Sequence, residues 1–278
     1  MLRNLFGALM LGLGLASLAP AQSLESKGIS QKFQDRAADV ISVMRIPETL
    51  GVMARENAAA AAELEPGPPG WDAALARLNA PERLLPIFAE ATGQALMTAD
   101  QPLIDKALTF YTTHPGKKAL SLELSAREAM LDPDVEDQAM RAAGKARAPA
   151  THRMRQIEDL RDAMGILDAN VAGSMNSLLA TQRGFADGIG DPSAINPGEV
   201  AGQEDDIRAE LDDWGRAVLF LAYSGLTDAE VDQLIAFSKS PEGRALDRLL
   251  NDAYDSVYTR LGYDIGLLSA SQINGTDL

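Results

Sequence analysis

The sequence contains no cysteine, and it has two histidines, His114 and His152. Without cysteine the chain cannot form disulfides or thiolate nucleophiles, and it cannot be anchored as a cysteine-linked lipoprotein. Zinc and copper sites usually use histidine or cysteine, so little beyond carboxylates remains to build them. Aromatic residues are also few, with seven Phe, five Tyr and two Trp. This argues against a surface that stacks sugars or bases. We predict no metal and no cofactor.

Long apolar runs are absent except at the amino terminus. Arg3 precedes an apolar stretch at residues 5–18, and the Ala-Pro-Ala of residues 19–21 has the small side chains of a cleavage site. The stretch is shorter than the roughly 20 residues that a membrane-spanning helix needs. We therefore expect a signal peptide at residues 1–21, export to the periplasm or beyond the cell, and no membrane span after its removal.

Positive charge is also scarce, with 25 Lys and Arg against 40 Asp and Glu. The formal charge is −15, and it becomes −16 when Arg3 is lost with the leader. An acidic surface repels phosphate backbones and anionic lipids, which excludes nucleic acid as an expected partner. Residues 141–152 are a basic exception with Gly144 and Pro149, and we expect a linker there between two acidic halves.

The residues that are abundant, above all Ala, Leu and Glu, predict an all-α fold, a multi-helix bundle. The clearest periodicity lies in "EDDIRAELDDWGRAVLFLAYSG", where one apolar stripe runs along a helix. The stripe consists of Ile207, Leu211, Trp214, Val218 and Leu221. The charged residues of this segment, Asp212, Asp213 and Arg216 among them, are expected on its solvated side. Thr227 and Glu230 then have the spacing of a capping box. In the first half Asp100 is a good N-cap, with Pro102 tolerated in the first turn of its helix.

Two segments of the chain resemble each other at an offset of 127 residues. "IDKALTFYTTHPGKKA" (residues 104–119) lies under "VDQLIAFSKSPEGRAL" (residues 231–246). Farther upstream Met44 and Ile46 match Met164 and Ile166 at an offset of 120. We therefore expect two related helical repeats, at residues 25–140 and 153–265, with the linker 141–152 between them and a tail at 266–278.

The glycine followed by a basic residue in both segments invites comparison with a phosphate-binding loop. Such a loop needs an earlier glycine and a following Ser or Thr. Tyr111 and Ser238 stand at the first position, and Lys118 and Ala245 at the second, so the pattern fails. The alternative is a helix start. Ser240 would cap it, Pro241 would be its first residue, and Gly243 would allow close approach of another helix.

Other chemistries have weak support in the sequence. "DPDVED" (residues 132–137) resembles the opening of a calcium loop, but Asp137 replaces the required glycine and Ala143 the required glutamate. We expect an interhelical turn there. No Gly-x-Ser-x-Gly elbow is present. Paired carboxylates drawn from distant positions remain open, because chance pairs among 40 acids are abundant.

The repeated segment resembles the bacterial domain of unknown function 2059 family, whose hallmark is a "FYxSPxGKK"-like stretch. The residues that carry the resemblance are Phe110, Tyr111, Gly116, Lys117 and Lys118 in the first copy and Phe237, Ser240, Pro241, Gly243 and Arg244 in the second. The first copy has Thr113 and His114 where Ser-Pro is usual, and the second has Ser238 in place of Tyr. The resemblance implies an all-helical domain of the bacterial envelope, with no established activity, cofactor or catalytic residue.

These observations predict an exported, non-catalytic binding or interaction module whose partner is an envelope protein. Two alternatives stay open: a carrier of a small apolar ligand between helices, and an enzyme of unrecognised type. A carrier needs a deep apolar pocket. An enzyme needs a cleft in which carboxylates with shifted pKa values converge. An interaction module should expose an apolar patch.

Overall fold

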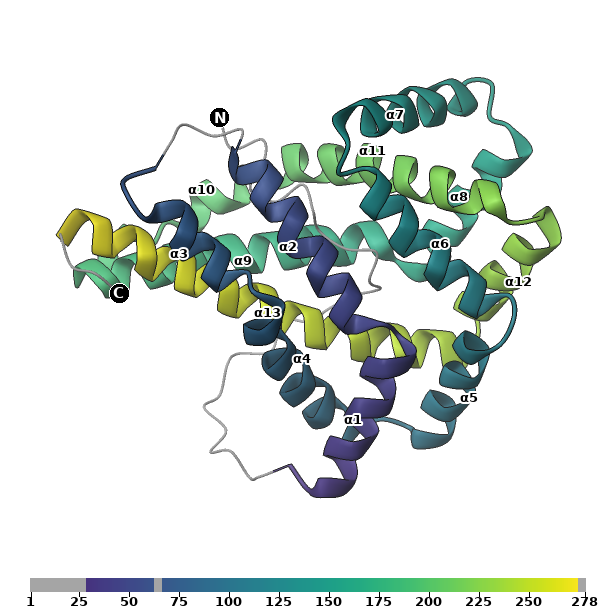
Figure 1. Ribbon diagram of the computed structural model, residues 1–278, viewed down its shortest axis with the longest axis horizontal. Coiled ribbons are helices and arrows are strands. Elements are labelled where there is room, and N and C mark those ends of the chain that lie inside the picture. Colours follow the sequence, from purple (N-terminus) through teal and green to yellow (C-terminus); the bar gives the residue numbers. More distant parts are fainter. Residues whose placement is uncertain (1–28, 63–66, 275–278) are drawn as a thin grey trace.

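The computed structural model describes residues 29–62 and 67–274 (Figure 1). The expected signal peptide lies outside the described residues. Within them the chain is helical and contains no β-strand, which confirms the all-α fold. The α-helices up to the expected linker are α1 (Gln31–Val43), α2 (Ile46–Ala62), α3 (Trp71–Leu78), α4 (Pro81–Leu96), α5 (Gln101–Thr112), α6 (Gly116–Ala129) and α7 (Pro133–Arg147). The later ones are α8 (His152–Met164), α9 (Ile166–Ile189), α10 (Pro197–Ala201), α11 (Glu204–Ala222), α12 (Asp228–Ser238) and α13 (Pro241–Asn274). Two 3₁₀ turns, η1 (Pro192–Ala194) and η2 (Tyr223–Gly225), precede α10 and α12.

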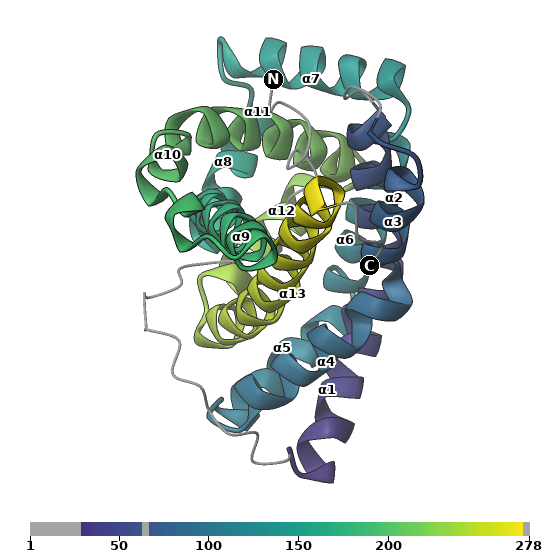
Figure 2. The same cartoon turned by 90° about the vertical axis from the view of Figure 1, so that its left-hand side faces the viewer.

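The long helix α13 runs through the middle of the molecule (Figure 1). It lies side by side with α9, and it also packs against α4 and α5 (Figure 2). The contact with α9 is close because both helices carry glycine there. A Cβ atom at Gly266 would overlap the carbonyl oxygen of Thr181, and one at Gly184 would overlap that of Tyr263. We expected a tail at residues 266–278, but its described part, residues 266–274, is the end of α13.

Two large hydrophobic cores and a small cluster between α3 and α13 hold the described part of the chain together, and each takes helices from both halves. One core joins α1, α2, α4 and α5 to the buried face of α13, including Leu246, Leu250 and Val257. The other joins α6 and α7 to α8, α11 and α12, with Ile157 and Val218 fully buried. The halves are therefore interlocked in one body, since neither half completes a core by itself.

The helix starts read from the sequence are confirmed. Thr227 and Glu230 form the capping box of α12, and the Asp100 side chain accepts a hydrogen bond at the start of α5. Pro241 is the first residue of α13. The turn expected at residues 132–137 is in fact the start of α7, because Asp132 caps it. In the expected linker, residues 141–147 form the end of α7.

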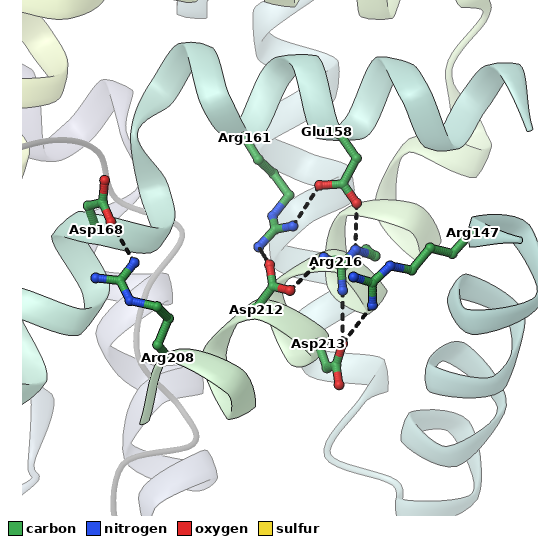
Figure 3. A network of polar contacts seen from close by, with 8 residues as sticks. All are labelled: Arg147, Glu158, Arg161, Asp168, Arg208, Asp212, Asp213 and Arg216. Carbon is green, nitrogen blue, oxygen red and sulfur yellow. Dashed lines mark hydrogen bonds and ion pairs between the residues drawn. The ribbon is translucent and has the colours of Figure 1, made fainter. Parts of the chain in front are cut away.

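The polar side of α11 differs from the sequence expectation. Arg216 and Arg161 are each 5 % exposed, and both contact Glu158 and Asp212 (Figure 3). Arg216 Nε and Nη2 lie 2.6 Å from carboxylate oxygens of Glu158 and Asp212, and Nη1 lies 2.9 Å from Asp213. The prediction that Arg216 is solvated was wrong because α8 supplies Glu158 opposite it. Burial opposes ionisation of Asp212, but hydrogen bonds from Arg216 and Arg161 lower its pKa overall.

Candidate functional site

A small pocket opens where the α1–α2 junction, α6 and α13 meet. In the two views α2 and α6 lie beside each other on one side of α13 (Figures 1 and 2). The lining residues are Met44, Arg45, Ile46, Thr49, Leu120, Glu123, Leu124, Arg127, Leu250 and Tyr254. Its volume of about 50 Å³ exceeds the ~10–15 Å³ that one water needs on the same measure. It therefore has room for a group of a few atoms.

Glu123 of α6 provides the titratable acid of this pocket. The buried Tyr223 hydroxyl donates a hydrogen bond to its Oε1 atom. Burial raises the pKa of Glu123 to about 7, although the Tyr223 hydrogen bond and the charge of Arg127 oppose the rise. The carboxyl is consequently divided between its neutral and ionised forms near pH 7.

Arg127, one helical turn after Glu123, brings a permanent positive charge to the pocket. Its Nε atom lies 3.0 Å from Glu56 Oε1, and its Nη2 atom donates to the other oxygen of the same carboxylate. The two side chains are 5 % and 9 % exposed. Burial opposes the charge of Arg127, but Glu56 raises the pKa of the guanidinium so that it stays protonated. Such a two-pronged contact fixes the orientation of the guanidinium plane.

Arg45 stands at the rim in an unusual backbone conformation. Its φ of 54° lies in the left-handed region, which side chains other than glycine, Asn and Asp seldom adopt. The guanidinium donates to Glu48 at 3.1 Å and to Ser121 at 3.4 Å. Its side chain is 38 % exposed. At the matching position of the second half, 120 residues later, the chain has Gly165 with a φ of 62°.

Two hydroxyl groups complete the polar lining. Thr49 on α2 donates to the Arg45 carbonyl at 3.1 Å. Burial raises the pKa of Tyr254 on α13 to about 12, with Arg127 and a hydrogen bond to Thr49 opposing the rise. The Tyr254 ring packs edge-on against Phe88, with the ring centres 4.8 Å apart. The remaining lining residues are apolar, so the pocket combines a polar set of groups with aliphatic walls.

The residues of the repeated motif lie outside this pocket, and the structure brings many of them together at the α5–α12 contact. Phe110 stacks on Phe237 at 3.9 Å with nearly parallel rings, and Tyr111 packs edge-on against both. A Cβ atom on Gly116 would overlap the carbonyl oxygen of Phe110. Gly243 stands in the same relation to Phe237. Both glycines thus permit a tight turn from one helix into the next.

The polar motif residues hold the helix ends. The Ser240 hydroxyl accepts a hydrogen bond from the Gly243 backbone at 3.0 Å, which confirms the predicted cap, and Pro241 opens α13. Arg244 donates to the Lys239 carbonyl, because that oxygen is left without a helical partner where α12 ends. Lys117 is exposed.

Lys118, the residue that follows Lys117, forms an ion pair with an acid of α12. Lys118 lies 3.0 Å from Glu230, the capping-box residue of α12, and His114 lies 2.9 Å from the same carboxylate. Hydrogen bonds from Thr227 and Lys118 lower the pKa of Glu230 to about 2. The contact joins the two halves.

Sequence reasoning missed the pocket residues, although one signal was present. Glu123 lies four residues after Ala119 and three before Ala126, so helical spacing places it on the same face as these two small apolar residues. A carboxyl on a buried stripe predicts a shifted pKa. Arg45 gave no comparable signal, because a positive φ at an arginine cannot be read from sequence.

Two classes of site have no support in the part of the chain that is described. Residues 29–62 and 67–274 contain no group of three His, Asp or Glu side chains placed to hold a metal ion. In the same ranges no helix is long and apolar enough to cross a membrane. No known family model, no curated protein and no solved structure matches the chain.

Proposed function

We propose that this protein is exported by means of residues 1–21 and acts as a non-catalytic binding module of the cell envelope. The pocket beside Glu123 would be its binding site. One observation carries the proposal: two guanidinium groups, a carboxyl with a pKa of about 7 and two hydroxyls line a single pocket. Groups with shifted pKa values that converge in a pocket are typical of functional sites.

The dimensions of the pocket favour binding of one small group over the alternatives. A carrier of apolar ligands would need several hundred Å³, whereas this pocket has about 50 Å³ and a polar lining. A reaction between two substrates would need more room as well. An apolar docking surface also lacks support. Among the described residues, Met97 is the one large hydrophobic residue with an exposed side chain, and a single residue does not make a patch.

Acid–base catalysis by Glu123 is the second candidate, since a carboxyl with a pKa of about 7 suits proton transfer at neutral pH. Turnover of a bound ligand, followed by NMR, would distinguish this candidate from simple binding. The binding proposal expects the bound compound to be recovered unchanged.

We further infer that the two halves arose by duplication, in line with the resemblance to the domain of unknown function 2059 family. The order of the helices supports this. At the offsets found in the sequence, α1, α2, α4 and α5 correspond to α8, α9, α11 and α12, and α6 corresponds to the first part of α13. Positive φ values at Arg45 and Gly165, and the stacking of Phe110 on Phe237, add local support.

Two measurements test the proposed function. The first is N-terminal sequencing of the protein recovered from the periplasm of an expressing bacterium. It should begin near Gln22, and an uncleaved chain retained inside the cell would contradict export. The second is a thermal-shift screen of residues 22–278 against small carboxylates, amines, amides and polyols. At least one class should raise the Tm of the unaltered protein. The same rise is expected in the control variant Glu128→Gln, which changes an exposed acid on the same helix. The shift should differ in Glu123→Gln, because this substitution replaces the acid of the pocket by an amide. If no class raises the Tm, the pocket is not a binding site for small molecules.

A further inference from the structure

The charges around the pocket decide which ligand charge it can accept. Arg45 and Arg127 are permanent cations, and Glu48 and Glu56 each offset one of them. With Glu123 neutral, these groups carry no net charge. A bound carboxylate would then add one negative charge to the pocket, as ionisation of Glu123 does when the pocket is empty. An amine would instead be placed beside two guanidinium groups, which repel it.

The backbone at the rim points to a role for the Arg45 side chain. A residue with a Cβ atom in the left-handed region costs about 1–2 kcal/mol relative to the ordinary helical region. The second half has glycine at the matching position and avoids this cost. Keeping an arginine there is therefore unfavourable for the fold, and strain of this kind tends to persist where the side chain has a function. Arg45 also precedes the first residue of α2, so the partial positive charge of that helix end lies at the same rim.

The walls of the pocket limit the rest of the ligand. Leu120, Leu124 and Leu250 face it from α6 and α13, and Met44 and Ile46 from the α1–α2 junction. These side chains suit a short aliphatic group. With about 50 Å³ available, a long acyl chain or a second charged group has no place.

We propose that the pocket binds the carboxylate of a short aliphatic acid, about the size of acetate or propionate. Arg45 is its cationic partner at the rim, and protonated Glu123 donates a hydrogen bond to it. This rests on the proposed function and adds the chemical class of the ligand. It also predicts that the protein takes up a proton on Glu123 when the ligand binds.

The groups that surround Glu123 permit this proton uptake. Tyr223 on η2 and Arg127 on α6 favour its ionised form, whereas burial favours the neutral form. Burial raises the pKa of Tyr111 on α5, and the nearby charges of Glu123 and of Asp247 on α13 raise it further. The other charged and titratable neighbours are Glu56 and Arg45 at α2 and Tyr254 on α13. A second negative charge in this setting favours protonation of Glu123, because two carboxylates in contact cannot both stay ionised at low cost.

The test is isothermal titration calorimetry of residues 22–278 with sodium propionate, propionamide and propylamine, in carboxylate-free buffers from pH 6 to pH 9. Propionate should bind best at pH 6, and its affinity should fall about tenfold for each pH unit above 7, because each bound anion requires one proton. Glu123→Gln should bind propionate with an affinity that does not change over this range, since its amide donates at every pH. Glu128→Gln should keep the pH dependence of the unaltered protein. Arg45→Gly should lose at least tenfold in affinity, and Arg55→Ala, at an exposed arginine of α2, should not.

Each outcome decides between the proposals. If propylamine or propionamide binds and propionate does not, the ligand class is wrong and the pocket still functions as a binding site. If propionate binds without any pH dependence in the unaltered protein, the role of Glu123 is refuted. If Arg45→Gly binds as tightly as the unaltered protein while its Tm is unchanged, the role of Arg45 is refuted. If none of the three compounds binds and the wider screen is also negative, both the ligand class and the proposed function fail.

Discussion

Replacing Glu123 by glutamine should stabilise the folded protein at pH 8 and leave its stability almost unchanged at pH 4. In the unfolded chain the carboxyl has its ordinary pKa of 4.5, and in the folded protein the pKa is about 7. Stability from the neutral form is fully present below pH 4.5 and declines as the pH rises to 7. Because one pKa unit corresponds to 1.36 kcal/mol, the ionised carboxyl costs the folded state about 3 kcal/mol above pH 7. Glutamine has no such cost, and its amide oxygen can still accept the Tyr223 hydrogen bond.

Urea unfolding at pH 4 and pH 8 measures this effect. The difference in unfolding free energy between Glu123→Gln and the unaltered protein should be near zero at pH 4. It should reach about 3 kcal/mol in favour of the variant at pH 8. Asp247, whose pKa burial raises to about 8, is present in both proteins and cancels in the difference. Glu128→Gln should show no such change between the two pH values. A difference for Glu123→Gln that is equal at pH 4 and pH 8 would refute the shifted pKa.

Three further substitutions test the packing. Arg216→Met should lower the unfolding free energy by about 1.5–3 kcal/mol, because it removes the charge-assisted hydrogen bonds of a buried guanidinium to Glu158, Asp212 and Asp213. The half-exposed Arg208→Met should cost less than about 1 kcal/mol, and equal losses in urea unfolding would contradict the network. Gly243→Ala should cost about 1–3 kcal/mol because its Cβ would overlap the Phe237 carbonyl. Gly51→Ala, in open space on α2, should stabilise by about 0.5–1 kcal/mol, and the reverse order in Tm would refute the close approach. Arg45→Gly should stay within about 1 kcal/mol of the unaltered protein, because relief of the left-handed φ offsets the flexibility of glycine. A larger loss on chemical denaturation would mean that the arginine is needed for folding.

The helices and their starts could be predicted because their determinants are local. Thr227, Asp100 and Ser240 each cap a helix through a hydrogen bond to a backbone amide within three residues. The apolar residues after Pro241 also recur at helical spacing from Leu246 onward, and they form the buried face of α13. Such signals lie within a few residues of one another, so a single sequence contains them.

The partners of the charged residues could not be predicted, because they depend on contacts between distant helices. Arg216 is buried since Glu158 stands opposite it, 58 residues away in the chain. The pocket has the same origin: Glu123 meets Tyr223 across 100 residues. The repeated motif revealed the offset of 127 residues but no functional site, because its glycines and phenylalanines form the turns that follow α5 and α12.

The difference between the two halves is more informative about function than their similarity. The proposed duplication would give the same backbone turn between α1 and α2 as between α8 and α9, and glycine is the residue that makes this turn at least cost. The second half has that glycine, and the first has Arg45. The same asymmetry holds on α6, where Glu123 and Arg127 correspond at the offset of 127 to Leu250 and Tyr254 of α13. All four of these residues line the pocket, the charged pair on one wall and its uncharged counterparts on another. Under the proposed duplication, one half carries charge at these positions and the other does not, which yields a single asymmetric site, and binding should therefore saturate at one ligand per chain.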